Sequence, residues 1–411
     1  MYNDTNVIEK QIDARTFKGL EDIRVGKVLH NSLLDIKRYP ELSVGAGNKH
    51  LLKTIPCIFT SGISVRKQHK TEIAFVFSNS YKIRQDHLRN YRSISKLLDN
   101  TLCIEPGAST LKIQQSGVLR YIHSWNKELE KVENISLSSK KYLLFNLVDA
   151  YMDAYNVINI CKKNSIKHIN VFSDSHPIDN LIVQMAKKTG ISTSTVQHGL
   201  FLEEGYLNSV SDYFLAWGEQ SRERAIAMGI AEESIKLVGM PQLINHPVKN
   251  SMIKSKNNRI ALICSSPEHD PLILEILKEY ASKYDKKIWV KLHPGTKSNI
   301  ITGEQIEKVI TDELSVYDIV DFVDAAITAK STVFVEYLVQ LFPVFLYETD
   351  DARYEKMDWC KFTDSNGFEE LMKKISEDSE AFKKQMISAR SYYTLTDNIA
   401  SEYRAFFNSQ I

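Results

Sequence analysis

Cysteine is scarce in this 411-residue chain, and its five copies follow no pattern. They are Cys57, Cys103, Cys161, Cys264 and Cys360, and no two have the CxxC spacing of a metal or redox motif. A disulfide framework and a zinc knuckle are therefore excluded, and reduced thiols in the cytoplasm are expected. The 16 glycines and 10 prolines are too few for a collagen-like or low-complexity chain.

An excess of one charge and a long hydrophobic run are also missing. Lys and Arg number 52 and Asp and Glu 51, and this net charge of +1 argues against nucleic acid as a partner. The longest nearly apolar run, residues 331–347, contains Glu336 and Pro343 and is not expected to cross a membrane. The first ten residues lack the apolar core of a signal peptide. We therefore expect a cytoplasmic protein, with peripheral association at the inner face of the membrane left open.

Several well-known active-site motifs are absent. The sequence has no GxGxxG, GxxxxGK[ST], HExxH or GxSxG, which disfavours a Rossmann dehydrogenase, a P-loop ATPase and an α/β-hydrolase. No DxD-like pair follows a strand, and Asp350-Asp351 lies in a loop. We therefore expect neither a metal nor a cofactor.

Alternating strands and helices dominate the chain, most clearly from Lys167 onward. The expected strands are 72–77, 101–104, 167–173, 192–197, 212–217, 234–238, 259–264, 287–292, 325–328 and 343–347. The expected helices are 140–162, 178–188, 219–228, 271–283 and 332–341. Such βαβ units predict parallel sheets covered by helices.

The length fits two domains of roughly 200 residues each. The polar, basic stretch 247–258 interrupts the pattern and is the expected linker. It separates an acceptor-side Rossmann-like domain, 1–246, from a nucleotide-donor domain, 259–395, and a final helix in 396–411 is expected to pack back on the first domain. Two doubly wound domains facing a central cleft would bind substrates at the carboxyl ends of their strands.

A basic segment lies in the first domain. Residues 61–100 carry eight basic and three acidic side chains in an otherwise neutral chain. Such a segment forms either a solvated helix face or a contact for an anionic acceptor or lipid headgroups.

The first candidate catalytic segment is Val196-Gln197-His198-Gly199, where a strand runs into a histidine. The unperturbed pKa of histidine, near 6.5, suits proton transfer, and Gly199 permits a tight turn and close approach of a ligand. Glu203, Glu204 and Gly205 follow in the same loop. The alternative is a histidine that merely bonds a turn.

Three further segments favour phosphate binding. Lys291 and His293, followed by Pro294 and Gly295, end a strand. Ser331 or Thr332 caps the expected helix 332–341, whose free amides favour an anion, and Glu336 lies about one turn later, where it could accept hydrogen bonds from ribose. The third segment is the pair Ser265 and Ser266, which follows strand 259–264.

Together these segments resemble a known group of enzymes. The resemblance rests on QHG (197–199), DYFLAWG (212–218), the stretch from Gly229 to Pro241, KLHP (291–294) and the Ser-Thr…Glu helix (331–336). This order resembles the GT-B superfamily of bacterial cell-surface polymer transferases, both the CDP-glycerol glycerophosphotransferase-like enzymes of teichoic acid and capsule synthesis and the bacterial sialyl- and polysialyltransferases. It spans residues 167–347, under half of the chain.

The resemblance implies roles for these residues. His293 and Pro294 match the HP motif, and Ser331 and Thr332 the Ser/Thr motif, both of which hold donor phosphate. Glu336 resembles the glutamate that binds ribose. His198 matches the general-base histidine of the glycerophosphotransferase-like enzymes, while Glu204 is the alternative base of the sialyltransferase pattern.

One departure concerns the donor, because His198-Gly199 is followed by Leu200 and Phe201 rather than by Thr and a nearby Lys. The sequence therefore predicts a glycosyltransferase of capsule or surface polysaccharide synthesis, with a CMP-, CDP- or UDP-linked donor and a glycan or lipid-linked glycan acceptor. A CDP-polyol phosphotransferase, a UDP-GlcNAc 2-epimerase-like enzyme and a non-catalytic GT-B-like scaffold are the alternatives.

Overall fold

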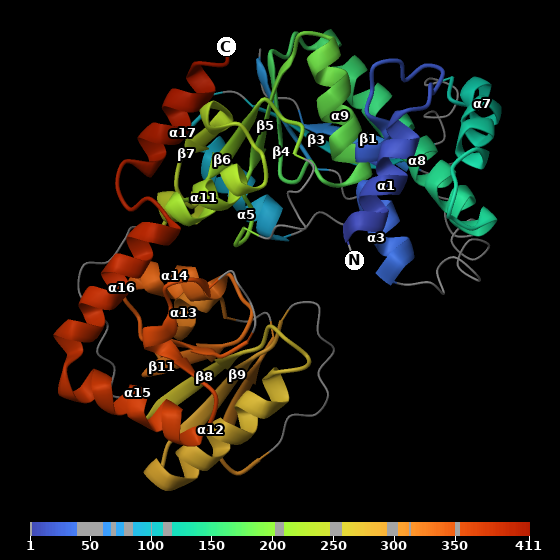
Figure 1. Cartoon of the computed structure of the whole chain (residues 1–411). Coiled ribbons are helices and arrows are strands. Elements are labelled where there is room, and N and C mark those ends of the chain that lie inside the picture. Colours follow the sequence, from blue (N-terminus) through green and yellow to red (C-terminus); the bar gives the residue numbers. More distant parts are fainter. Residues whose placement is uncertain are drawn as a thin grey trace. The chain divides into compact units, whose positions relative to one another are not determined.

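The structure is a computed structural model of the whole chain (Figure 1). It describes residues 2–38, 61–66, 71–77, 85–99, 101–109, 117–201, 209–246, 257–293, 303–311, 314–349 and 354–411. The chain divides into two compact units, the first formed by Met1–Trp217, Arg222–Ile244 and Asn398–Ile411 and the second by Gly218–Ser221 and Asn245–Asp397.

The first unit contains a seven-stranded sheet with the order β1-β3-β2-β4-β5-β6-β7. Its strands are β1 (Ser61–Arg66), β2 (Ile73–Val76), β3 (Thr101–Ser109), β4 (His168–Val171), β5 (Ser192–Val196), β6 (Tyr213–Ala216) and β7 (Ile235–Leu237). All neighbours pair in parallel except β1 and β3, which are antiparallel. The carboxyl ends of β2, β4 and β5 therefore lie side by side.

Helices cover both faces of this sheet, because successive side chains of a strand point to opposite sides. Ala74 and Val76 of β2 belong to the hydrophobic core that the sheet forms with a group of helices. These are α1 (Tyr2–Asp13), α2 (Val25–Val28), α3 (His30–Arg38), α7 (Leu119–Glu130), α8 (Leu137–Lys163) and α9 (Pro177–Lys188). Phe75 faces the other way, toward Tyr91 of α5 (Gln85–Ser95) and Phe407 of α17 (Ile399–Asn408).

The C-terminal helix α17 belongs to the first unit, and Figure 1 shows it, in red, beside the strands of that unit. The hydroxyl of Tyr403 donates a hydrogen bond of 3.0 Å to the carbonyl of Gly239. Phe406 and Phe407 pack edge-on against the ring of His168 on β4. Burial of these aromatic rings is the physical reason that the chain returns to the first sheet after completing the second.

The second unit contains a six-stranded sheet with the order β10-β9-β8-β11-β12-β13, parallel throughout. Its strands are β8 (Arg259–Ile263), β9 (Lys287–Lys291), β10 (Ile306–Ile310), β11 (Ala325–Thr328), β12 (Val344–Tyr347) and β13 (Lys361–Phe362). Its helices are α12 (Asp270–Tyr284), α13 (Val316–Ile319), α14 (Val333–Gln340), α15 (Ser365–Glu377) and α16 (Ser379–Tyr393), and α11 (Glu219–Ala227) is divided between the two units.

The predicted fold class, α/β with two doubly wound Rossmann-like sheets, is confirmed. The sequence did not predict β1, β10 and β13, because β1 and β10 lie in segments without clear alternation and β13 is two residues long. Residues 247–256 of the linker and residues 67–70, 78–84 and 100 of the basic segment lie outside the described residues. Within the described part of the chain, no helix is long and apolar enough to span a bilayer.

Candidate active site

The carboxyl edge of the first sheet carries the histidine that the sequence singled out. His198 lies two residues beyond the end of β5, beside Phe172, which follows β4. Its Nδ1 is 2.7 Å from the carbonyl oxygen of Phe172. Because a carbonyl only accepts, Nδ1 carries the proton, and the lone pair of the neutral ring lies on Nε2. This is the tautomer that a general base needs if it uses Nε2.

The turn that carries His198 is held by hydrogen bonds of the adjacent Gln197, two of them with Trp217. The side-chain oxygen of the buried Gln197 accepts a hydrogen bond of 2.8 Å from the backbone amide of Trp217, and its amide nitrogen donates to the carbonyl of Gly199. The indole nitrogen of Trp217 donates in turn to the carbonyl of Gln197 at 2.9 Å. The QHG and DYFLAWG segments thus hold each other through side-chain and backbone hydrogen bonds. These bonds fix the position of the His198 backbone.

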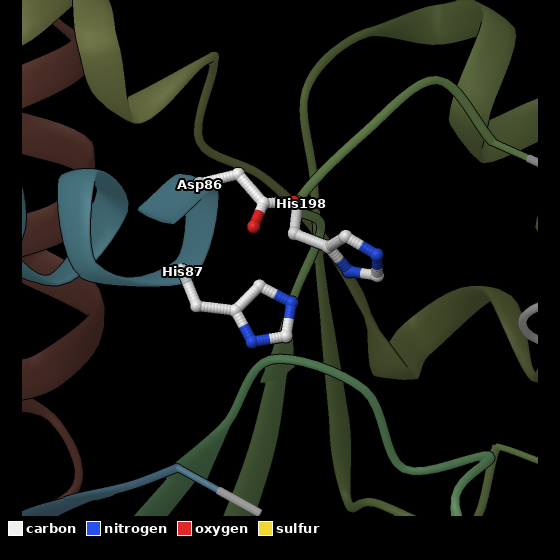
Figure 2. Close-up of side chains that lie close together, drawn as sticks. All are labelled: Asp86, His87 and His198. Carbon is white, nitrogen blue, oxygen red and sulfur yellow. The ribbon is translucent and has the colours of Figure 1, made fainter. Parts of the chain in front are cut away.

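Two residues that sequence reasoning missed lie beside His198. His87 is 5% exposed, and its ring centroid is 4.7 Å from that of His198 at an interplanar angle of 71°. Figure 2 shows Asp86 and His87, from the first turn of α5, directed toward the His198 ring. The sequence placed both only in the basic segment 61–100. Their adjacency as Asp-His at a helix start after a strand was the available signal.

The structure describes one acidic residue near the loop after His198 but not the glutamates of the loop itself. Glu203, Glu204 and Gly205 lie outside the described residues, so Glu204 as the alternative base stays a prediction. Downstream of them, the fully buried carboxylate of Asp174 accepts hydrogen bonds from the Ser209 hydroxyl and from the amides of Val210 and Ser211, at 2.8 to 3.0 Å. Asp174 therefore anchors residues 209–211, just before β6.

The carboxyl edge of the second sheet brings the predicted phosphate-binding segments together, because β9, β8 and β11 are neighbours. The Ser265 hydroxyl accepts a hydrogen bond from the amide of Lys330 and lies 3.1 Å from the hydroxyl of Thr328. The amides of Ser265 and Ser266 both donate to the carboxylate of Asp270 at 3.0 to 3.1 Å. These groups are thus already bonded within the protein.

Asp270 occupies the place at which the sequence put a phosphate, next to the end of β8. Burial raises the pKa of its carboxyl above the ordinary value, and the amides of Ser265 and Ser266 and the charge of His293 oppose that rise. The Ser266 hydroxyl bonds Nδ1 of His269 at 2.8 Å. A donor phosphate here would contact the hydroxyls or displace the carboxylate, so both serines remain predicted ligands.

The Ser-Thr segment forms the start of α14 one residue later than predicted, at Val333. The Ser331 hydroxyl accepts a hydrogen bond of 3.2 Å from the Val333 amide, whereas Thr332, the N-cap residue, makes no side-chain cap bond. Glu336, in the first turn, is only 2% exposed. A ribose would reach its carboxylate only after a change of rotamer or a shift of the surrounding side chains.

Lys291 and His293 differ in exposure although they are two residues apart. Lys291 ends β9 and is 8% exposed, and its carbonyl accepts a hydrogen bond from the amide of Cys264, the residue after β8. His293, just beyond the strand, is exposed, and Pro294 lies outside the described residues. Of this pair, His293 offers the side chain that meets solvent at the sheet edge.

Comparison with known proteins bears on these sites. Residues 268–408 match the family model described as CDP-Glycerol:Poly(glycerophosphate) glycerophosphotransferase. This region contains Lys291, His293, Ser331, Thr332 and Glu336, but not His198. The comparison with curated protein sequences finds no match.

Solved structures share the fold at low sequence identity. The UDP co-structure of MnaA from S. aureus is 14% identical, with a TM-score of 0.54 over 82% of this chain and 97% of that one. A UDP-GlcNAc 2-epimerase from Neisseria meningitidis, bound to UDP-GlcNAc, is 12% identical, with a TM-score of 0.54 over 82% of this chain and 100% of that one. The wall teichoic acid polymerase TagF, as an H444N variant with CDPG, is 13% identical, with a TM-score of 0.49 over 92% of this chain and 97% of that one.

At this identity the first two structures show the fold alone, and they confirm the predicted α/β fold of the GT-B type. The family match supports a nucleotide-dependent transferase. The resemblance predicted from the sequence is confirmed, because the C-terminal third of the chain matches the CDP-glycerol:poly(glycerophosphate) glycerophosphotransferase family within a GT-B-like fold.

Proposed function

We propose that this chain is a nucleotide-dependent transferase of capsule or surface polysaccharide synthesis, with His198 as the general base on an acceptor hydroxyl. The observation that carries the proposal is the hydrogen bond from Nδ1 of His198 to the Phe172 carbonyl, which leaves the lone pair on Nε2. The lock between Gln197 and Trp217 holds that histidine at the carboxyl end of β5, where ligands bind in open α/β sheets.

The chemistry follows from this tautomer. Nε2 of His198 takes the proton of the acceptor hydroxyl as its oxygen forms a bond to the electrophilic centre of the donor. The bond from that centre to the nucleotide's phosphate oxygen breaks, and the electron pair leaves with the nucleotide. On the donor side, His293, Lys291 and the amides at the start of α14 stabilise the departing negative charge.

The first donor candidate is a nucleotide sugar, as the sequence predicts from the residues that follow His198. A second candidate is a CDP-linked polyol phosphate, and the family match over residues 268–408 favours it. In the first case the acceptor oxygen attacks the anomeric carbon, and in the second it attacks phosphorus. Both reactions need the same base and release a nucleotide, so the donor decides between them.

A thermal-shift panel with CMP, CDP, UDP, GDP and their sugar or glycerol conjugates tests the donor assignment. A ligand that binds only the folded state at 100 times its Kd stabilises it by about 2.7 kcal/mol. We expect one nucleotide to raise Tm in the wild-type protein and to raise it only about half as much in His293→Ala, because a tenfold weaker Kd roughly halves the stabilisation at this concentration. UDP or GDP would indicate a hexose donor, CMP a sialic-acid-like donor, and CDP a polyol phosphate.

Transfer assays with the donor so identified test the base. Because Glu204 is the rival, His198→Gln and Glu204→Gln form a matched pair, each replacing a proton acceptor by an amide. Loss of transfer in His198→Gln alone supports the proposal, and loss in Glu204→Gln alone overturns it. Epimerised donor formed without any acceptor would identify an epimerase. If no nucleotide raises Tm, the alternative of a non-catalytic GT-B-like scaffold is favoured.

A further inference from the structure

Three side chains with metal-ligand chemistry meet at the carboxyl edge of the first sheet, although two of them come from α5 and one from the turn after β5. Asp86, His87 and His198 each offer one ligand atom, and these atoms all lie within 4.8 Å of one another. Figure 2 shows the carboxylate and the two rings gathered in one place. Two imidazoles and one carboxylate are a donor set that suits divalent ions of the zinc class.

His198 has the orientation that metal-bound histidines usually have. Its Nδ1 donates to the carbonyl of Phe172 at 2.7 Å, and this leaves Nε2 as the nitrogen that can coordinate an ion. In metal sites, such a bond from the second nitrogen fixes the tautomer and the ring direction, and it makes the coordinating nitrogen more basic. The same contact that prepares a general base therefore prepares a ligand.

His87 is held in place by packing. Its ring stacks on Phe172 with centroids 5.1 Å apart and an interplanar angle of 22°, and Phe172 stacks on Phe77 at 5.2 Å. The side chain is 5% exposed. A ring fixed against an aromatic wall loses little further freedom when it binds an ion, and the apolar wall limits access of water to the site.

We propose that Asp86, His87 and His198 form a binding site for one divalent transition-metal ion of the zinc class. Zinc binds nitrogen at about 2.0–2.1 Å, so the three ligand atoms would have to approach to about 3.3 Å from one another. Asp86, in the first turn of α5 and only partly buried, supplies part of that movement by side-chain rotation, and small rotations of the two imidazole rings supply the rest. Water completes the coordination.

The bound ion would occupy the Nε2 lone pair that the proposed transfer reaction uses. Metal occupancy and proton acceptance by His198 are then mutually exclusive, and the ion inhibits transfer. This consequence rests on the proposed function, whereas the metal site itself does not, because the ion binds whether or not His198 is a base.

The test uses the full chain after EDTA treatment and desalting. Zn²⁺ binding is measured by isothermal titration calorimetry, and Co²⁺ binding by the visible absorption that a protein-bound cobalt ion acquires. We expect one ion per chain, and an affinity at least tenfold weaker in Asp86→Asn and in His87→Ala. His123→Ala, which removes an exposed histidine of α7, is the control and keeps the wild-type affinity.

Absence of saturable binding, or unchanged affinity in the well-folded Asp86→Asn variant, overturns the site. Asp86→Asn keeps the test decisive if removal of the buried His87 ring prevents folding. Inhibition of transfer by Zn²⁺ that EDTA reverses supports the link to catalysis. Zn²⁺ binding without inhibition leaves the site intact and counts against His198 as the base, so the two proposals fail separately.

Discussion

Polar side chains at the carboxyl edges of the two sheets differ in their hydrogen-bond partners. At the first edge, Nδ1 of His198 donates to the Phe172 carbonyl, and a ring nitrogen of His198 lies within 4.8 Å of ligand atoms of Asp86 and His87. At the second edge, the Ser265 hydroxyl contacts Thr328 and Lys330, and the amides after β8 bond Asp270. The same sequence pattern, polar residues directly after a buried strand, thus produced a histidine oriented by one backbone carbonyl in one unit and a hydrogen-bonded framework in the other.

The difference shows what a strand-end motif predicts. It predicts the position of a side chain at the ligand-binding edge, but whether that side chain faces a ligand depends on its partners. A buried hydroxyl or amide finds a protein partner wherever one is in reach, because an unsatisfied polar group costs about 1–3 kcal/mol. His198 needs only one of its two ring nitrogens for the bond to Phe172 that orients it.

The largest effect is expected for His198 and tests whether the edge of the first sheet carries the catalytic base. His198→Gln removes the proposed proton acceptor, and general-base catalysis contributes about 10²–10⁴-fold. We expect kcat for transfer to fall by that factor while the melting temperature changes little, because the ring lies at the sheet edge. Steady-state kinetics with the identified donor measures it. A decrease of less than threefold would mean that His198 only closes a turn.

The next effect concerns the lock that positions this histidine. Gln197→Leu leaves the buried backbone amide of Trp217 without its 2.8 Å acceptor, at a cost of up to about 3 kcal/mol. Urea unfolding measures the stability, and kcat should fall together with it because the turn loses its fixed geometry. Wild-type stability in this variant would show that the two segments hold each other by packing alone.

A histidine in the interior of the first sheet sharpens the contrast with His198. Burial lowers the pKa of His168 from 6.5 to about 3, and both ring nitrogens contact serine hydroxyls, Ser192 at 3.1 Å and Ser194 at 2.8 Å. The folded state keeps this ring neutral while the unfolded chain protonates it below pH 6.5. Stability is therefore lost as the pH falls from 6.5 toward 3, by about 2 kcal/mol between pH 7 and pH 5.

Urea unfolding at several pH values measures this dependence, with His168→Gln as the comparison. The glutamine variant has no group that titrates there, so its stability should fall less steeply over the same interval. Equal slopes in the two proteins would assign the acid sensitivity to other groups.

The smallest effect tests whether the second edge binds a ligand at all. His293→Ala removes an exposed cationic or hydrogen-bonding group from the proposed phosphate site, and we expect nucleotide affinity to weaken about tenfold. Calorimetric titration with the nucleotide found by thermal shift measures it. Affinity that stays at the wild-type value would leave the second edge as a structural framework only.

Much of the fold could be predicted because its elements are locally encoded. Strand β11 was predicted with the observed bounds, and α9 and β5 to within a residue, since buried parallel strands and amphipathic helices have clear periodicity. The antiparallel strand β1 was missed because its segment lacks clear alternation and joins the sheet only through β3. The start of α14 differs from the prediction by one residue, because Thr332 is the N-cap residue and the first helical residue is Val333.

Residues close together in the chain encode the βαβ order, the two sheets and the position of His198 after a strand. Side-chain contacts of the folded protein, which no local pattern contains, bring Phe172 to His198, place Asp86 and His87 beside it, and bond Asp270 to the amides after β8. Phe172 and the Asp86–His87 pair lie far from His198 in the sequence. They become its neighbours because β2, β4 and β5 pair side by side. The Asp270 contact is short-range, but it required the side-chain geometry of the turn between β8 and α12.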